Sequence, residues 1–140
     1  MSRARTIACV LLALFYGFAG VMHLVDPAPF LAITPAWVPF PRQMIAFTGV
    51  AELAGAAGIV QWRWPGLRRA AGWGLALYAL CVWPANFQHL FNDLAFREHG
   101  GDGGAGLGYH IPRLAAQPLL IWLTLWASGA IGHRGPRVRT

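Results

Sequence analysis

The stretch Phe47-Thr-Gly-Val-Ala-Glu-Leu-Ala-Gly-Ala-Ala-Gly58 places one carboxylate, Glu52, in a run of small and apolar residues. Such a run is typical of a membrane helix that packs closely against others, because small residues let helix backbones approach one another. A charge at that depth costs roughly 3 kcal/mol or more, so it usually marks a paired or functional group. The stretch therefore predicts a membrane helix bundle with a polar group inside it.

The composition of the whole chain agrees with this interpretation. Of its 140 residues, 56% are hydrophobic and 11% are charged, whereas about a quarter of an average soluble domain is charged. All eleven basic residues are arginine, and the net charge is +6. In a membrane protein, an excess of basic residues indicates how the chain is oriented in the membrane and where it contacts anionic lipid. No soluble basic segment carries interleaved aromatic residues, so we expect no nucleic-acid partner.

Four apolar segments are each long enough to cross about 30 Å of hydrocarbon, which takes roughly 20 helical residues. They cover about residues 6–25, 43–62, 69–91 and 111–132. The sequence thus predicts an all-α fold: a single transmembrane domain over residues 1–140 that forms a four-helix bundle. The first segment resembles a signal peptide but is long for a signal core, so we expect it to remain as the first span.

The arginines predict the orientation of the bundle. Eight of the eleven lie before the first segment, between the second and third, or after the fourth. By the positive-inside rule, that side is cytoplasmic. We therefore expect a multi-pass protein of the inner (plasma) membrane with both termini cytoplasmic and outer loops at 26–42 and 92–110. The first loop is proline-rich yet apolar, so we expect it to cover the outer end of the bundle as a lid.

Each predicted helix carries a polar residue at a similar depth. At 1.5 Å per helical residue, Glu52 lies about 14 Å below the start of its segment, near the midplane. Helical side chains lean toward the N-terminus, so Glu52 leans outward while those on the first and third segments lean inward toward it. The layer consists of His23, Glu52, Asn86, Arg113 and Gln117. Tyr16 and His89 share faces with members of this layer and are secondary candidates.

The polar layer has two interpretations: a site for ligand binding or proton exchange, or a set of hydrogen bonds that only specifies helix packing. Glu52 is either protonated, or ionised and paired. We expect His23 and Asn86 to be its nearest partners, with Gln117 farther away. Arg113 is also expected to be farther away, because arginine near a helix end tends to extend toward water.

The sequence gives little reason to expect a metal. Cys9 and Cys81 form no CxxC pair, which leaves no dithiol or cysteine metal centre to expect. His89 and His110 together are a conceivable pair of ligands near the outer face, but their spacing is not that of a known ligand set. We therefore expect no metal site.

Four motifs in order resemble the DoxX-like family of small four-helix membrane proteins. They are Gly17-Phe-Ala-Gly-Val-Met-His23 with Ile33-Thr-Pro-Ala-Trp-Val-Pro39, Gly49-Val-Ala-Glu-Leu-Ala-Gly55, Trp83-Pro-Ala-Asn86, and Arg113-Leu-Ala-Ala-Gln117. The resemblance covers nearly all of residues 12–126. It implies an inner-membrane protein from a family named after a subunit of a thiosulfate:quinone oxidoreductase, with some relatives linked to redox defence. The five residues of the polar layer are motif positions in this resemblance.

The first hypothesis for function is a redox-linked membrane subunit whose pocket binds a quinone headgroup. His23 and Glu52 would exchange its protons, while Asn86, Arg113 and Gln117 would orient its carbonyls. The sequence contains no evident electron carrier and no covalently bound cofactor is expected, so the function would need a redox partner protein. The alternatives are a non-catalytic protein that binds or transports a lipid or small molecule, and a purely structural polar cluster. Enzymatic activity and oligomeric state stay open.

Overall fold

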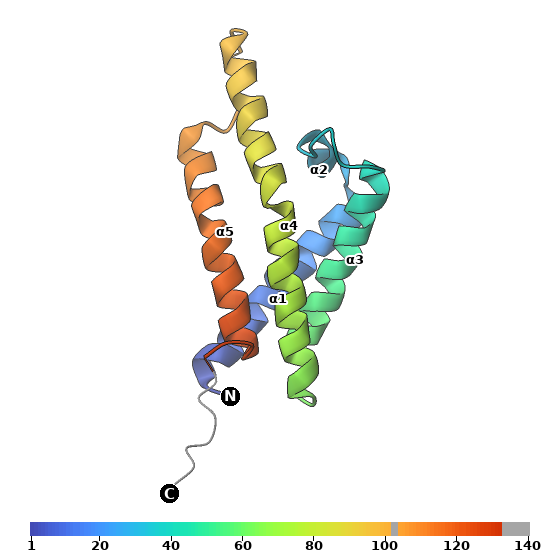
Figure 1. Ribbon diagram of the computed structural model, residues 1–140, viewed down its shortest axis with the longest axis vertical. Helices are drawn as coiled ribbons and strands as arrows, with labels where there is room; N and C mark the ends of the chain where they lie inside the picture. Colours follow the sequence, from blue (N-terminus) through green and yellow to red (C-terminus); the bar gives the residue numbers. More distant parts are fainter. Residues whose placement is uncertain (102–103, 133–140) are drawn as a thin grey trace, which may run out of the picture.

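The computed structural model describes residues 1–101 and 104–132, and these residues form five helices and no strand. The all-α prediction is therefore confirmed. Along the chain the helices are α1 (Arg3–Val25), α2 (Ala28–Ala32), α3 (Pro41–Val60), α4 (Pro65–Glu98) and α5 (Leu107–Ser128) (Figure 1).

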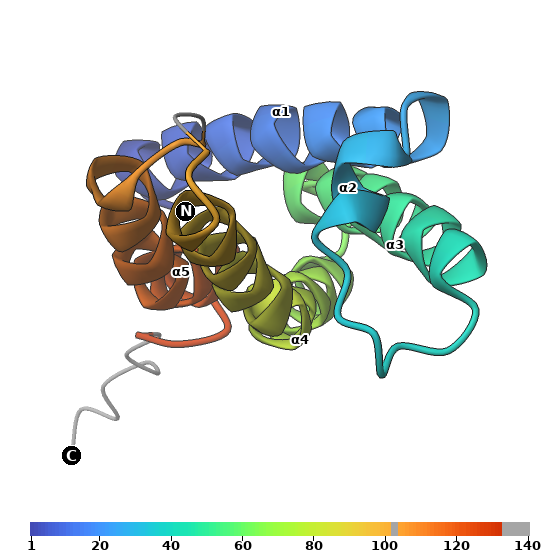
Figure 2. The same ribbon diagram turned by 90° about the horizontal axis from the view of Figure 1, so that it is seen from above.

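The four long helices pack as a bundle with two distinct ends. The helix α1 packs along α3, and α4 packs along both α3 and α5 (Figure 2). At one end, which we call the termini end, α1 starts, α5 ends and α3 turns into α4 (Figure 1). The other, the loop end, carries α2 and the connection between α4 and α5.

Arginine side chains tie the helices together at the termini end. The guanidinium of Arg5 donates to the carbonyls of Ile131 and Gly132, at 3.3 and 3.1 Å, which joins the start of α1 to the chain beyond α5. Arg68, at the start of α4, donates from Nε to the carbonyl of Ser128 at 3.2 Å. The bond from Arg68 satisfies a carbonyl that the end of α5 leaves without an intrahelical partner.

Two glycines allow α1 and α3 to approach closely. A Cβ added at Gly20 would lie 2.8 Å from the carbonyl oxygen of Gly49. One added at Gly49 would lie 2.9 Å from the carbonyl oxygen of Gly20 and 2.9 Å from the Cβ of His23. The contact therefore leaves no room for a side chain at either position, and it brings the His23 face of α1 against α3.

The buried apolar core occupies the half of the bundle nearer the termini end. It consists of Cys9, Leu12, Tyr16, Ala56, Ile59, Leu75 and Ala127. Toward the loop end, the buried polar residues include His23, Glu52, Asn86 and Gln117. These four residues mark the level at which the candidate site lies.

The helix boundaries differ from the predicted spans mainly at the loop end. The helix α4 continues to Glu98, and α5 already begins at Leu107, so the connection predicted at 92–110 is limited to residues 99–106. The prediction ended each helix where its apolar run ended. The length of an apolar run indicates how much of a helix suits the hydrocarbon of a membrane. A helix can continue beyond that run into polar sequence. Pro41 and Pro65 begin α3 and α4, the first-turn position that proline favours.

In the described part of the chain, α1 and α3 are the two helices long and apolar enough to cross a membrane, judged by length and composition. This property suggests association with a membrane.

Candidate functional site

The contact between His23 and Glu52 is the centre of the polar layer. The two side chains are 9% and 3% exposed, and His23 Nδ1 lies 2.9 Å from Glu52 Oε2. His23 Nδ1 also lies 2.8 Å from the carbonyl oxygen of Ala19. A carbonyl can only accept, so Nδ1 carries the hydrogen. The predicted pairing of Glu52 with His23 is confirmed.

The Glu52 carboxylate keeps hydrogen-bonding capacity in this arrangement. Its Oε2 atom is buried, and among the residues that the structure describes it has no partner with hydrogen-bond geometry. The His23 Nδ1 hydrogen points at Ala19, so the short contact with Glu52 becomes an ion pair when the imidazole is protonated. A buried polar atom without a partner is uncommon in a purely structural cluster, so the unused capacity of Glu52 favours a ligand or a transferable proton at this point.

Tyrosines complete the surroundings of Glu52, and sequence reasoning gave them little weight. Tyr78 of α4 faces the Glu52 carboxylate, within reach of its oxygen atoms. Its ring meets the ring of Tyr16 edge-on, with centroids 6.2 Å apart. Tyr78 lies eight residues before Asn86, which puts it on the same face of α4. That spacing was the signal in the sequence that could have identified it.

Asn86 and Gln117 join α4 to α5. Asn86 Nδ2 donates to Gln117 Oε1 at 3.3 Å, and Gln117 Nε2 donates to the carbonyl of Ala79 at 2.6 Å. The prediction that Asn86 is a nearest partner of Glu52 is wrong in this respect, because its side-chain amide pairs with Gln117. The reason is the packing of α4 directly against α5, which depth along the helices does not specify.

Arg113 lies near the start of α5 and extends toward the loop end, the direction expected for it from the sequence. Its Nη1 donates to His89 Nδ1 at 2.6 Å, and its guanidinium carbon lies 5.6 Å from the centroid of the Tyr109 ring. The structure thus places His89, a secondary candidate, in a separate polar group at the loop end.

A cavity of about 570 Å³ brings the predicted residues together. Its wall includes all five members of the polar layer, His23, Glu52, Asn86, Arg113 and Gln117, and also Tyr16. Tyr78 and Tyr109 add two further hydroxyls. The remaining wall is largely apolar, with Phe15, Val82, Leu119, Leu120 and Leu123. A largely apolar cavity with a few converging polar groups is the usual form of a small-molecule site.

The short helix α2 covers the His23 side of this cavity. The ring of Phe30 stacks on the ring of His23, with centroids 3.7 Å apart and planes inclined by 23°. Asn92 of α4 donates to the carbonyl of Ala32 at 3.1 Å, which holds α2 against the bundle. The proline-rich segment therefore lies over the loop end of the bundle.

A family model described as a domain of unknown function (DUF8561) matches residues 12–128. The chain belongs to this family. The matched part of this DUF8561 chain contains every residue of the polar layer and most of all four long helices. No curated protein and no solved structure matches the chain.

Proposed function

We propose that this DUF8561 protein is a DoxX-like integral protein of the inner membrane that crosses the bilayer four times. We further propose that its cavity binds a quinone headgroup and that the protein acts as a redox-linked membrane subunit. The observation that carries the proposal is the convergence of five polar residues from four helices on one largely apolar cavity.

The sequences and outer faces of α4 and α5 support two further spans. Residues 70–91 and 114–132 contain no Asp, Glu, Lys or Arg. Large apolar side chains are exposed on all four long helices, among them Leu14, Phe47, Leu77 and Leu119. A continuous apolar exterior of this kind suits lipid, whereas soluble proteins rarely expose large apolar patches.

The distribution of arginine supports the orientation. The termini end carries Arg3, Arg5, Arg63, Arg68 and Arg69, and the loop end carries Arg42, Arg97 and Arg113. The more basic end faces the cytoplasm under the positive-inside rule. In this orientation the loop end is the outer end, and the cavity lies in the outer half of the membrane.

The lining of the cavity suits a flat ring that carries carbonyl groups and an apolar tail. The amides of Asn86 and Gln117 and the guanidinium of Arg113 are hydrogen-bond donors on one side of the cavity. Phe15, Leu119 and Leu123 provide an apolar wall beside them. Donors would hold the carbonyls, and the apolar wall would accept the tail.

His23 and Glu52 are the proposed proton-exchange groups. The His23 Nδ1 and Glu52 Oε2 atoms lie 2.9 Å apart. A proton taken up by one can therefore pass to the other without a large movement. A bound quinone supplies two-electron, two-proton chemistry, with the electrons delivered by a partner redox protein. The protein residues would hold the headgroup and exchange its protons.

Part of the layer also supports a packing role. Asn86 and Gln117 bond each other and the Ala79 carbonyl, so their amides stabilise the α4–α5 contact. This observation favours the second candidate, a structural polar cluster, for those two residues alone. The free oxygen atom of Glu52 is not explained by packing.

Extraction of the native ligand tests the proposed function. The full chain is purified in mild detergent, and its bound lipids are extracted and analysed for quinone by mass spectrometry. We expect up to one quinone per protein chain in the wild type. A Glu52→Gln variant should retain clearly less quinone than the wild type. Glu98→Gln, which removes an exposed carboxylate at the end of α4, is the matched control and should retain quinone. Equal amounts in the wild type and Glu52→Gln would show that the quinone is bound elsewhere or comes with detergent.

A further inference from the structure

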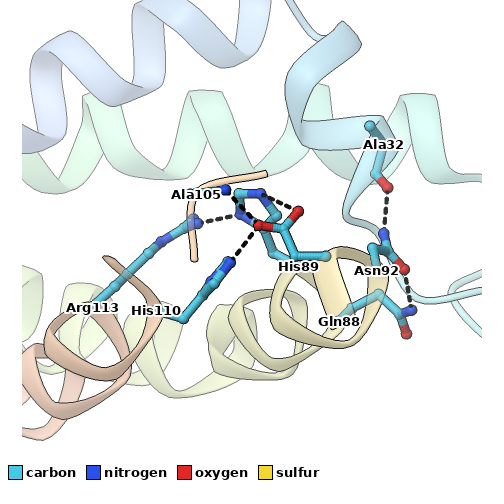
Figure 3. Close-up of polar contacts among 8 residues, drawn as sticks. Ala32, Gln88, His89, Asn92, Ala105, His110 and Arg113 are labelled. Atoms are coloured by element: carbon cyan, nitrogen blue, oxygen red, sulfur yellow. Dashed lines mark hydrogen bonds and ion pairs between the residues drawn. The ribbon is translucent and has the colours of Figure 1, made fainter. Parts of the chain in front are cut away.

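Three side chains at the loop end form a cluster outside the cavity wall. His89 and Asp93 lie one turn apart on α4. His110 lies at the start of α5, and Figure 3 shows its side chain beside that of His89. His110 Nε2 donates to Asp93 Oδ2 at 2.8 Å, and His89 Nε2 lies 4.0 Å from Asp93 Oδ1. One nitrogen or oxygen atom from each of the three residues lies within 4.8 Å of the other two.

The three groups are a chemically suitable set of ligands. Two imidazoles and one carboxylate bind zinc and related divalent transition metals, with bonds of roughly 2.0–2.2 Å to nitrogen and oxygen. Three atoms within 4.8 Å of one another leave a central point within about 2.8 Å of each atom, less than 1 Å beyond the bond length of zinc. Each of the three ligand atoms would therefore have to move by less than about 1 Å to reach a central ion.

His110 has more hydrogen-bonding capacity than its surroundings use. The residue is 1% exposed, and in the described part of the chain its Nδ1 atom has no hydrogen-bond partner. Within the described residues, the hydrogen bond from Nε2 to Asp93 is the one that orients the His110 ring. A buried imidazole with so few partners is uncommon in a purely structural role. An ion would bind Nε2, the atom that faces Asp93, in place of the hydrogen bond to Asp93, and the ring hydrogen would move to Nδ1.

The carboxylate of Asp93 is held in place by a second hydrogen bond. Asp93 Oδ2 also accepts the backbone N–H of Ala105 at 2.7 Å, which ties the carboxylate to the segment after the glycine-rich turn. Its two oxygen atoms face the two imidazoles, Oδ2 toward His110 and Oδ1 toward His89, so the carboxylate is placed to share an ion with both rings.

Arg113 competes with a metal for His89. Its donation to His89 Nδ1 at 2.6 Å makes that atom an acceptor, so the neutral ring carries its hydrogen on Nε2, which faces Asp93. Coordination through Nε2 moves the hydrogen to Nδ1 and breaks the bond to Arg113. The guanidinium charge also repels a cation. Arg113 therefore has to turn away when an ion binds.

We propose that His89, Asp93 and His110 form a binding site for a divalent transition metal of the zinc class at the loop end, and that Arg113 weakens it. Since Arg113 also lines the cavity, ion binding would release its guanidinium for contacts there. The site stands independently of the quinone proposal, because none of its three ligands belongs to the cavity wall.

Titration of the purified, tag-free full chain with Co²⁺, followed by competition with Zn²⁺, tests this proposal. The expected result is one ion per chain, with the visible absorption of Co²⁺ bound to nitrogen and oxygen. His89→Ala and His110→Ala should each weaken binding by more than the roughly 10–100-fold that loss of a supporting contact costs. His89 is partly exposed, so His89→Ala remains informative if His110→Ala does not fold.

Two further variants make the test specific. His99→Ala removes an exposed imidazole at the same end, where Nδ1 lies 2.7 Å from the Ala95 carbonyl oxygen, and should leave the affinity unchanged. Arg113→Gln removes the competing donor and its charge and should tighten binding. The proposal is overturned if the wild type binds no Co²⁺ or Zn²⁺, if His89→Ala binds as the wild type does, or if Arg113→Gln weakens binding.

Discussion

Nδ1 of His23 lies 2.9 Å from Oε2 of Glu52, across the contact between α1 and α3. The two residues are 29 positions apart in the sequence, and each is almost fully buried. Their contact depends on the close approach of the helix backbones at Gly20 and Gly49, directly beside them. The glycine contact and the polar pair therefore form one structural unit, and changes at one should affect the other.

Replacement of Gly49 by Ala should destabilise the protein by about 1–3 kcal/mol, the usual cost of overpacking. The added Cβ would lie 2.9 Å from both the Gly20 carbonyl oxygen and the His23 Cβ, so α1 and α3 have to separate. The measurement is the unfolding transition in detergent. Gly17→Ala is the matched control, because a Cβ at Gly17 meets no atom within 4 Å. That variant should be neutral or slightly more stable, since alanine favours helix. Equal effects at both positions would contradict the close-contact explanation.

Asn86 and Gln117 should be coupled energetically. Asn86→Leu and Gln117→Leu each break the 3.3 Å bond between the two amides, and the second also removes the donor to Ala79. In a double-mutant cycle on unfolding free energy, we expect a coupling energy in the range of about 0.5–3 kcal/mol that contacting residues show. Additive effects would mean that the two amides stabilise the bundle separately.

Tyr78→Phe should weaken ligand retention severalfold and leave the unfolding transition nearly unchanged. The substitution keeps the ring packed against Tyr16 and removes only the hydroxyl that faces Glu52. The readout is the amount of extracted quinone beside the melting temperature of the same preparation. A lower melting temperature with unchanged retention would assign Tyr78 a packing role.

Stability should depend on pH through Asp93. The pKa of its carboxyl is lower in the folded protein than the ordinary value, first through the His110 hydrogen bond and then through that of Ala105. The stabilisation is therefore fully present above the ordinary pKa of 3.8 and is lost as pH falls through the folded value. The titratable groups that face the carboxylate are His110 and, at 4.0 Å, His89.

Asp93→Asn tests this dependence. In metal-free buffer the variant should be less stable than the wild type at neutral pH, and the difference should shrink as pH is lowered below about 4. The control is Glu98→Gln on the same helix, which should follow the wild type. A stability difference that stays constant down to acidic pH would show that charge on Asp93 does not stabilise the fold.

The sequence predicted much of this site because depth along a helix follows directly from residue number. Glu52, with small residues around it, could be placed at mid-depth and oriented toward His23, and the structure has the two in contact. Rotation of one helix about another does not follow from residue number. For this reason Asn86 was expected to be a nearest partner of Glu52, whereas its side-chain amide forms a hydrogen bond with Gln117.

The loop end shows a second limit of the sequence. Asp93 was expected in a loop, because the apolar run ends before it, so its position one turn after His89 on α4 was not considered. With that turn in place, Asp93 contacts both His89 and His110. The cluster depends on a helix that continues beyond its apolar segment, which composition alone does not indicate.

The measurement that tests the central claim most directly is the binding of a short-tailed quinone to the purified full chain, read as a shift in the unfolding transition. A ligand that binds the folded state at 100 times its Kd stabilises it by about 2.7 kcal/mol. The account predicts a saturable shift for the wild type and for Glu98→Gln, and a shift weakened at least severalfold for a folded Glu52→Gln variant. The same shift in Glu52→Gln as in the wild type, or no shift in any of the three, would contradict a quinone site at His23 and Glu52.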